Sequence, residues 1–182
     1  MKWNMIAVGL MACLGATASA QAPQPYAGLQ ERPIKALSEQ QIADLKAGRG
    51  MGLALAAELN GYPGPSHLLE LAPQLDLSSD QQAAIRSLFD AMKAEAIPIG
   101  ESLIDQEKAL DRLFASHTVT PDALQTATRQ IGETQARLRE AHLKYHLSTV
   151  ALLQPQQLEH YATLRGYAGG SGEHHPGMQR QN

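Results

Sequence analysis

Cysteine, aromatic residues and positive charge are all scarce in this 182-residue chain. The only cysteine is Cys13, and aromatic residues make up 4% of the sequence. The formal net charge of −3 at pH 7 argues against a nucleic-acid-binding protein, because such proteins present a basic surface. Runs of Val, Ile, Thr and aromatic residues, which are typical of strands, are also missing. The composition therefore predicts an all-α protein.

The first 20 residues have the features of a cleaved secretory signal peptide. Lys2 supplies the positive start, residues 6–14 form an apolar stretch, and Ala18-Ser19-Ala20 is a small-x-small cleavage site. The apolar stretch is too short to remain as a membrane-spanning helix. No later stretch is long and apolar enough, so we expect no transmembrane segment in the mature chain.

Processing of the signal peptide also determines whether the mature chain keeps the only cysteine. Cleavage after Ala20 removes Cys13, and the mature chain then forms no disulfide and offers no thiolate to a substrate or metal. The alternative is a lipoprotein, because residues 10–13 resemble a lipobox in which Cys13 would carry the lipid. Both routes take the protein out of the cytoplasm.

The mature sequence divides into three parts. Residues 21–36 contain three prolines and little periodicity, and we expect an extended segment there. Residues 37–167 carry repeated helical signals and form one predicted domain. Residues 168–182 are polar and begin with a glycine-rich stretch, which is typical of a disordered tail.

Three short motifs predict helix starts inside the domain. In two of them a serine at the N-cap is followed three residues later by glutamine, which is the pattern of a capping box. In the third, a proline suited to the first helical position is followed by glutamine. The residues that carry these motifs are Ser38 and Gln41, Ser78 and Gln81, and Pro155 and Gln157.

The apolar periodicity predicts two long helices joined by residues 116–119. The first carries a seam of apolar residues from Ile85 to Phe114, and Pro98 should kink it without ending it. The second carries apolar residues seven apart from Leu124 to Leu152, which indicates a partner helix along its length. We therefore expect a long antiparallel helical hairpin. Shorter flanking helices are predicted at 38–47, 51–59, 67–75 and 155–167.

The motifs at 77–81 (Leu-Ser-Ser-Asp-Gln) and 153–157 (Leu-Gln-Pro-Gln-Gln) resemble the two LTxxQ motifs of the Spy/CpxP family of periplasmic proteins. The order of signal peptide, short helix, hairpin and last helix is also similar, over residues 65–167. The second motif departs from the pattern, because Gln154 stands where the family has a capping threonine. The resemblance implies a periplasmic, cradle-like helical homodimer.

The resemblance implies two functions and does not choose between them. The first is an ATP-independent chaperone or envelope-stress protein, which binds unfolded or misfolded envelope proteins reversibly and requires no cofactor. The second is a heavy-metal sensor or metal-resistance protein, as in the related ZraP/CnrX-type proteins. An adaptor that binds a sensor kinase is a third hypothesis. No serine elbow, P-loop or dinucleotide fingerprint is present, and we expect no enzymatic activity.

Residues 50–60 are apolar around nearly the whole circumference of a predicted helix, so one face needs a cover. If part of this helix stays exposed, it is a candidate client-binding surface, with Met51, Leu53, Leu55 and Leu59 as its residues. The alternative is that the helix packs entirely against the hairpin or across a dimer.

His142 and His146 lie one helical turn apart on the return helix of the hairpin. This spacing suits two ligands of a zinc, nickel, cobalt or copper ion. The arrangement is not that of a zinc protease, because no glutamate follows His142. Additional ligands would have to come from another helix, such as His160, or from another chain. The alternative is two histidines on the edge of an ordinary helix.

Overall fold

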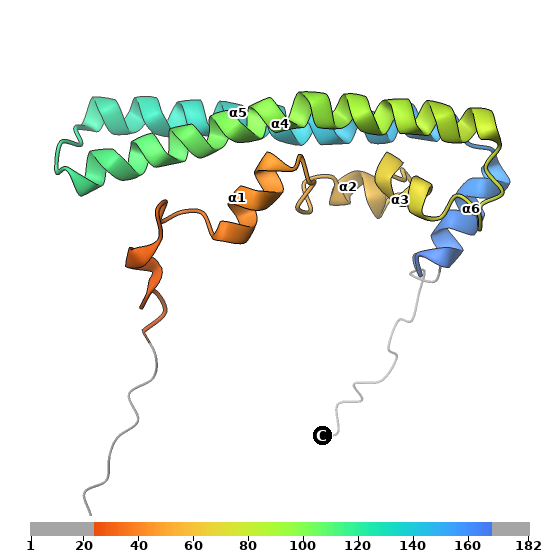
Figure 1. Ribbon diagram of the computed structural model, residues 1–182, viewed down its shortest axis with the longest axis horizontal. Helices are drawn as coiled ribbons and strands as arrows, with labels where there is room; N and C mark the ends of the chain where they lie inside the picture. The colour runs from red at the N-terminus through yellow and green to blue at the C-terminus, as the bar shows by residue number, and fades with distance from the viewer. Residues whose placement is uncertain (1–23, 169–182) are drawn as a thin grey trace, which may run out of the picture.

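A computed structural model describes residues 24–168 of the chain, which are helical and contain no strand. The predicted all-α class is therefore confirmed. A short 3-10 helix is followed by six α-helices (Figure 1). Their bounds are η1 Leu29–Glu31, α1 Glu39–Lys46, α2 Leu55–Glu58, α3 Pro65–Glu70, α4 Ser79–Ala115, α5 Pro121–Val150 and α6 Pro155–Leu164. The predicted signal peptide, Cys13 and all but the first residue of the predicted tail lie outside the described residues.

The two long helices α4 and α5 run antiparallel and pack against each other along their length (Figure 1). Pro98 lies inside α4 without ending it. Ile99, Leu103, Ile131 and Leu138 are buried between these helices and α1. The hairpin is thus held by the apolar seams seen in the sequence.

Ser78 and Gln81 form a complete capping box at the start of α4. The Ser78 hydroxyl accepts from the Gln81 N–H at 3.2 Å, and the Gln81 side chain accepts from the Ser78 N–H at 3.0 Å. Ser38 and Gln41 do the same for α1. At α6, the Gln157 side chain accepts from the Gln154 N–H at 3.0 Å, and Pro155 occupies the first turn.

The glutamines of the second and third motifs also bind each other. Gln81 Nε2 donates to Gln157 Oε1 at 2.9 Å, and Gln157 Nε2 donates back to Gln81 Oε1 at 3.2 Å. Each amide also donates to a backbone carbonyl of a neighbouring turn, at Leu152 and Leu75. The two motifs therefore join the start of α4 to α6.

The short helix α1 crosses α4 at a glycine. A Cβ atom on Gly100 would lie 2.7 Å from the carbonyl oxygen of Leu45, closer than real contacts allow. Leu45 is itself buried in the core. Only glycine lets the backbones of α1 and α4 approach this closely.

Three flanking helices are shorter than their predicted ranges. The helix predicted at 51–59 is reduced to α2, because Met51 and Gly52 adopt positive φ values of 44° and 80° and form a turn. The helix predicted at 67–75 begins at Pro65 and ends at Glu70. The last helix ends at Leu164, two residues before Gly166, whose φ is 72°.

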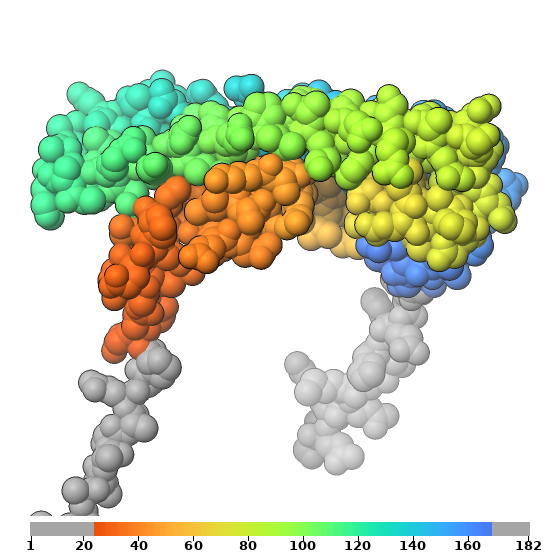
Figure 2. Space-filling view, in the orientation of Figure 1, coloured from red at the N-terminus to blue at the C-terminus, as the bar shows by residue number. Residues whose placement is uncertain are grey.

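The four short helices lie on the same side of the hairpin (Figure 1). In the space-filling view, the segment around α2 is set back between α1 and α3 (Figure 2). A second apolar cluster lies where α3 and α6 meet the start of α4. Its buried members are Leu68, Ala72, Leu75, Leu77, Ile85, Leu153 and Tyr161.

Candidate functional site

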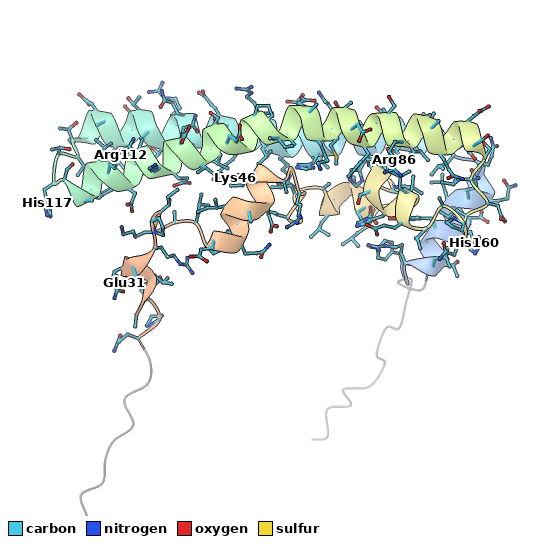
Figure 3. All side chains as sticks on the ribbon, viewed as in Figure 1. Glu31, Lys46, Arg86, Arg112, His117 and His160 are labelled. Atoms are coloured by element: carbon cyan, nitrogen blue, oxygen red, sulfur yellow. The ribbon has the colours of Figure 1, made fainter. Side chains whose placement is uncertain are left out.

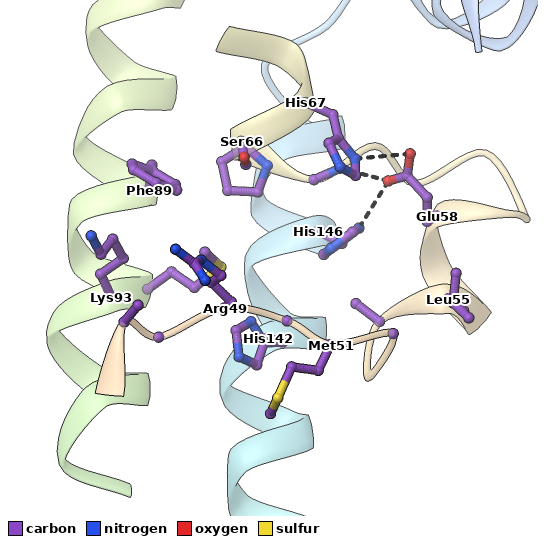
Figure 4. A pocket seen from close by; sticks show the side chains of 18 of the residues that line it. Arg49, Met51, Leu55, Glu58, Ser66, His67, Phe89, Lys93, His142 and His146 are labelled. Carbon is purple, nitrogen blue, oxygen red and sulfur yellow. Dashed lines mark hydrogen bonds and ion pairs between the residues drawn. The ribbon is translucent and has the colours of Figure 1, made fainter. Parts of the chain in front are cut away.

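A cavity of about 550 Å³ lies on the side of the hairpin covered by α2 and α3 (Figure 4). Its wall comes from five parts of the chain: the loop after α1, α2, α3, α4 and α5. Both predicted metal ligands, His142 and His146, line it, together with His67 and Glu58. The fold thus brings the pair into contact with segments that lie far from it in sequence.

Glu58 is the centre of the polar contacts beside this cavity. It is a buried carboxylate on α2, only 4% exposed. Its Oε1 lies 3.2 Å from His67 Nδ1 and accepts a hydrogen bond from the Tyr161 hydroxyl. Its Oε2 accepts from the Gly64 N–H at 3.1 Å. These bonds tie α2 to α3 and α6.

Longer contacts from three further side chains surround the same carboxylate. Arg165 Nε lies 3.7 Å and the Tyr167 hydroxyl 3.4 Å from Glu58 Oε1. His146 Nδ1 lies 3.9 Å from Oε2. A buried charge is stable only when it is paired and hydrogen-bonded, and Glu58 meets both conditions.

The contacts set the protonation state of Glu58. Burial alone would raise the pKa of its carboxyl group, but the hydrogen bonds from His67, Tyr161 and the Gly64 N–H lower it to about 2. Burial and the bond to Glu58 both raise the pKa of Tyr161. The pair is therefore a carboxylate bound by a neutral phenol at neutral pH.

His146 is fixed by the backbone of the turn between α2 and α3. Its Nδ1 lies 2.6 Å from the carbonyl oxygen of Tyr62, so this nitrogen carries the proton when the ring is neutral. A Cβ atom on Gly64 would lie 2.8 Å from Nε2 of the same ring. Gly64 therefore makes room for His146, and the 62–64 turn packs directly on it.

His142 is 2% exposed, and its Nε2 is a buried nitrogen with no hydrogen-bond partner among the described residues. Gly50 passes over the ring, since a Cβ atom there would lie 3.6 Å from Nδ1. Burial, and the neighbouring His146, lower the pKa of His142. The ring is therefore neutral at neutral pH, which leaves a lone pair on one nitrogen.

The predicted histidine pair is buried and does not lie on an exposed helix edge. His160, considered as a further ligand, is exposed on α6 and does not line the cavity (Figure 3). His67 lines it, although the sequence assigned it no role. Within residues 24–168, no three His, Cys, Asp or Glu side chains form a ready metal-binding group.

The predicted client-binding residues divide into two groups. Met51, Leu55 and Leu59 are 42%, 53% and 56% exposed, and Tyr62 beyond them is 40% exposed. Leu53 is partly buried against the hairpin core. We call the four exposed residues in and beside α2, namely Met51, Leu55, Leu59 and Tyr62, the α2 surface.

The sequence did not identify Glu58, Tyr161 or Tyr62 as residues of the site or of the α2 surface. Glu58 is the one charged residue in the apolar stretch 50–60. A charged residue in such a stretch needs either a buried partner or an exposed position, and this could have identified Glu58. The tyrosine partner lies 103 residues away in α6. No local pattern connects the two.

No helix within residues 24–168 is both long and apolar enough to cross a membrane. Comparison with family models, curated proteins and solved structures found no match for the chain. The similarity of its motifs to those of the Spy/CpxP family therefore remains a prediction from the sequence.

Proposed function

We propose that this protein is a periplasmic, ATP-independent chaperone of the Spy/CpxP type, which holds unfolded or misfolded envelope proteins reversibly. The observation that carries the proposal is the α2 surface. Four large apolar side chains within twelve residues are each at least 40% exposed. Clusters of exposed apolar side chains on a folded protein usually mark an interaction site.

The anchoring of α2 supports this proposal. Glu58 fixes the helix through bonds to α3 and α6, while Leu55 and Leu59, three residues before it and one after it, remain exposed. The exposed side chains are therefore held in place by a polar network beneath them. A surface of this kind is presented by the fold and is not the result of local unfolding.

The proposed mechanism is weak, repeated contact. Apolar side chains separated by polar ones can bind many sequences without a fixed pocket, as promiscuous binding surfaces do. Release follows from folding of the client, which buries the same apolar groups, and no nucleotide is required. A homodimer would present two α2 surfaces and raise the effective concentration of binding sites.

The test is suppression of aggregation. Light scattering by a chemically denatured model protein is measured with increasing amounts of mature wild-type chain, and with the double variant Leu55→Ser/Leu59→Ser. We expect suppression by the wild type and a loss of most of it in the variant. The matched control is Leu147→Ser on α5, because Leu147 is 62% exposed but does not belong to the α2 surface.

Two outcomes would reject the chaperone proposal. One is no suppression by the wild type at a several-fold molar excess. The other is an equal loss of suppression in the Leu147→Ser control, which would show that any exposed leucine serves as well as the α2 surface.

A metal-responsive protein is the second candidate, supported by the orientation of the imidazoles. His67 and His146 both direct Nδ1 at an oxygen atom, of Glu58 and of Tyr62, and this leaves Nε2 as the metal-binding nitrogen. Calorimetry with zinc, nickel, cobalt and copper would test it. We expect the double variant His142→Ala/His146→Ala to lose affinity and His117→Ala, in the hairpin loop, to keep it.

A further inference from the structure

The α4 side of the cavity carries a lysine, Lys93, that pairs with no acidic side chain of residues 24–168. Lys93 lines the cavity next to Phe89, with its Nζ 5.7 Å from the centre of the ring (Figure 4). Arg49 also lines the cavity, and its partner Asp44, at 2.6 Å, does not.

Of the two carboxylates in the wall, Glu58 is buried and bonded within the protein, and Glu70 is exposed. Glu58, on the opposite side from Lys93 in Figure 4, accepts from Tyr161 and the Gly64 N–H and contacts His67. Glu70 Oε1 accepts from the Ser66 hydroxyl at 3.3 Å. The unpaired Lys93 on one side, opposite a Glu58 carboxylate whose bonds are made within the protein, favours an anionic occupant next to Lys93.

The remainder of the wall is largely apolar. Met51, Leu55 and Met92 line it together with the Phe89 ring. Its volume of about 550 Å³ lies within the range of about 300–1,000 Å³ that is typical of small-molecule sites. An inorganic anion would leave this apolar surface uncovered, and a neutral apolar molecule would leave Lys93 without a partner.

We propose that the cavity binds a small amphipathic carboxylate. Its carboxylate group is placed at Lys93 and Arg49, and its apolar body lies against Met51, Leu55 and Met92. The proposal rests on the geometry of the cavity and does not depend on the chaperone function. A ligand here would contact two residues of the α2 surface from the inside.

Decanoate is a suitable probe, with decanol as its uncharged counterpart. Calorimetry on the full mature chain, below the micelle concentration, should show one site for decanoate and a much weaker interaction with decanol. Lys93→Gln should weaken decanoate binding by about 10- to 100-fold, the effect expected for loss of a charge-assisted contact. Lys108→Gln is the control, because Lys108 is exposed on the same helix and does not line the cavity.

A second variant separates the cavity from the exposed surface. Ala54→Phe places a ring in the cavity from the turn before α2 and should abolish binding of both probes. Leu59→Ser changes the α2 surface outside the cavity, and should reduce client holding while it leaves decanoate affinity unchanged.

Four results would overturn the proposal: no binding of decanoate, equal affinity for decanol, equal affinities of Lys93→Gln and Lys108→Gln, or full binding by Ala54→Phe. If circular dichroism shows that Lys93→Gln is unfolded, Arg49→Gln takes its place, since Arg49 is exposed and lines the same side. Chaperone activity is measured separately, so failure of either proposal is recognised by itself.

Discussion

The two ends of the hairpin are held in different ways. At the base, where α3 and α6 meet the start of α4, the Glu58 network and the Gln81–Gln157 pair lie beside a buried apolar cluster. At the tip, Phe114 is exposed, and Asp111 links α4 to the N-terminal segment through an ion pair with Lys35 Nζ at 3.3 Å and a hydrogen bond from the Lys35 N–H at 3.4 Å. Half of the Lys35 side chain is exposed.

The difference shows what each kind of contact can specify. A buried carboxylate with several donors tolerates few arrangements, because every lost bond leaves an unsatisfied group. A solvent-exposed ion pair contributes at most about 1 kcal/mol and constrains little. The base therefore fixes the position of α2 and the cavity, whereas the tip relies on the apolar seam between α4 and α5.

The largest expected effect is at the centre of the base. Glu58→Gln keeps the shape of the side chain but removes the charge that His67 and Tyr161 contact. We expect the free energy of unfolding to fall by about 3 kcal/mol, as when one partner of a buried pair is removed. Asp111→Asn at the tip should cost less than about 1 kcal/mol. Urea denaturation of the two variants measures both.

Acid provides an independent check on the same carboxylate. The pKa of Glu58 is lowered from 4.5 to about 2, so the folded form keeps the charge that the unfolded chain loses as the pH falls through 4.5. The stabilisation of the fold by the charged Glu58 is present above pH 4.5 and is lost between pH 4.5 and 2. Glu58→Gln should lack this acid-dependent loss. Equal costs for the Glu58 and Asp111 variants would contradict the comparison of base and tip.

Much of the framework was accessible from the sequence, because its signals are local. Ser78 and Gln81 mark the start of α4 within four residues, and the periodicity of apolar residues gives the length of the hairpin. The histidine pair was visible for the same reason, since its members lie on one helix.

The rest depends on contacts between distant segments. The bond between Glu58 and Tyr161 joins residues 103 apart, and the Gln81–Gln157 pair joins residues 76 apart. The turn at Met51 was missed because its positive φ goes against the preference of a non-glycine residue. An apolar run also does not show which of its residues are covered, and the partial burial of Leu53 could not be predicted from it.

A smaller effect is expected midway along the hairpin, where α1 crosses α4. Gly100→Ala would place a methyl group 2.7 Å from the Leu45 carbonyl oxygen and force the helices apart, at a cost of about 1–3 kcal/mol. Gly132→Ala on α5 is the matched control, because its methyl group meets nothing within 4 Å. That variant should be more stable by about 0.5–1 kcal/mol, as expected for alanine in a helix. Thermal unfolding followed by circular dichroism distinguishes the signs, and two changes of the same sign would contradict the close crossing.

The paired amides at the base should couple by a smaller amount. Gln81→Ala and Gln157→Ala each remove a capping bond as well as the reciprocal contact. The double variant should therefore be less destabilised than the sum of the two, with a coupling of about 1 kcal/mol in a double-mutant cycle. Gln41, whose capping box at α1 makes no such pair, should show additive behaviour with Gln81. If the effects of Gln81→Ala and Gln157→Ala on the free energy of unfolding are additive, the amide pair does not stabilise the base.

The smallest effect concerns His142, which lies between the two ends and is covered by the loop after α1. Burial and His146 lower its pKa below 6.5, so the unfolded chain binds a proton before the folded chain does as the pH falls. The contribution of neutral His142 to the free energy of unfolding is therefore complete above pH 6.5. It declines as the pH drops toward the lowered pKa. His142→Gln should flatten the dependence of the unfolding free energy on pH between about 7 and 5, a range above the titration of Glu58. His160→Gln, exposed on α6, should keep the wild-type slope. If both variants keep that slope, the proton taken up between pH 7 and 5 is not bound at His142.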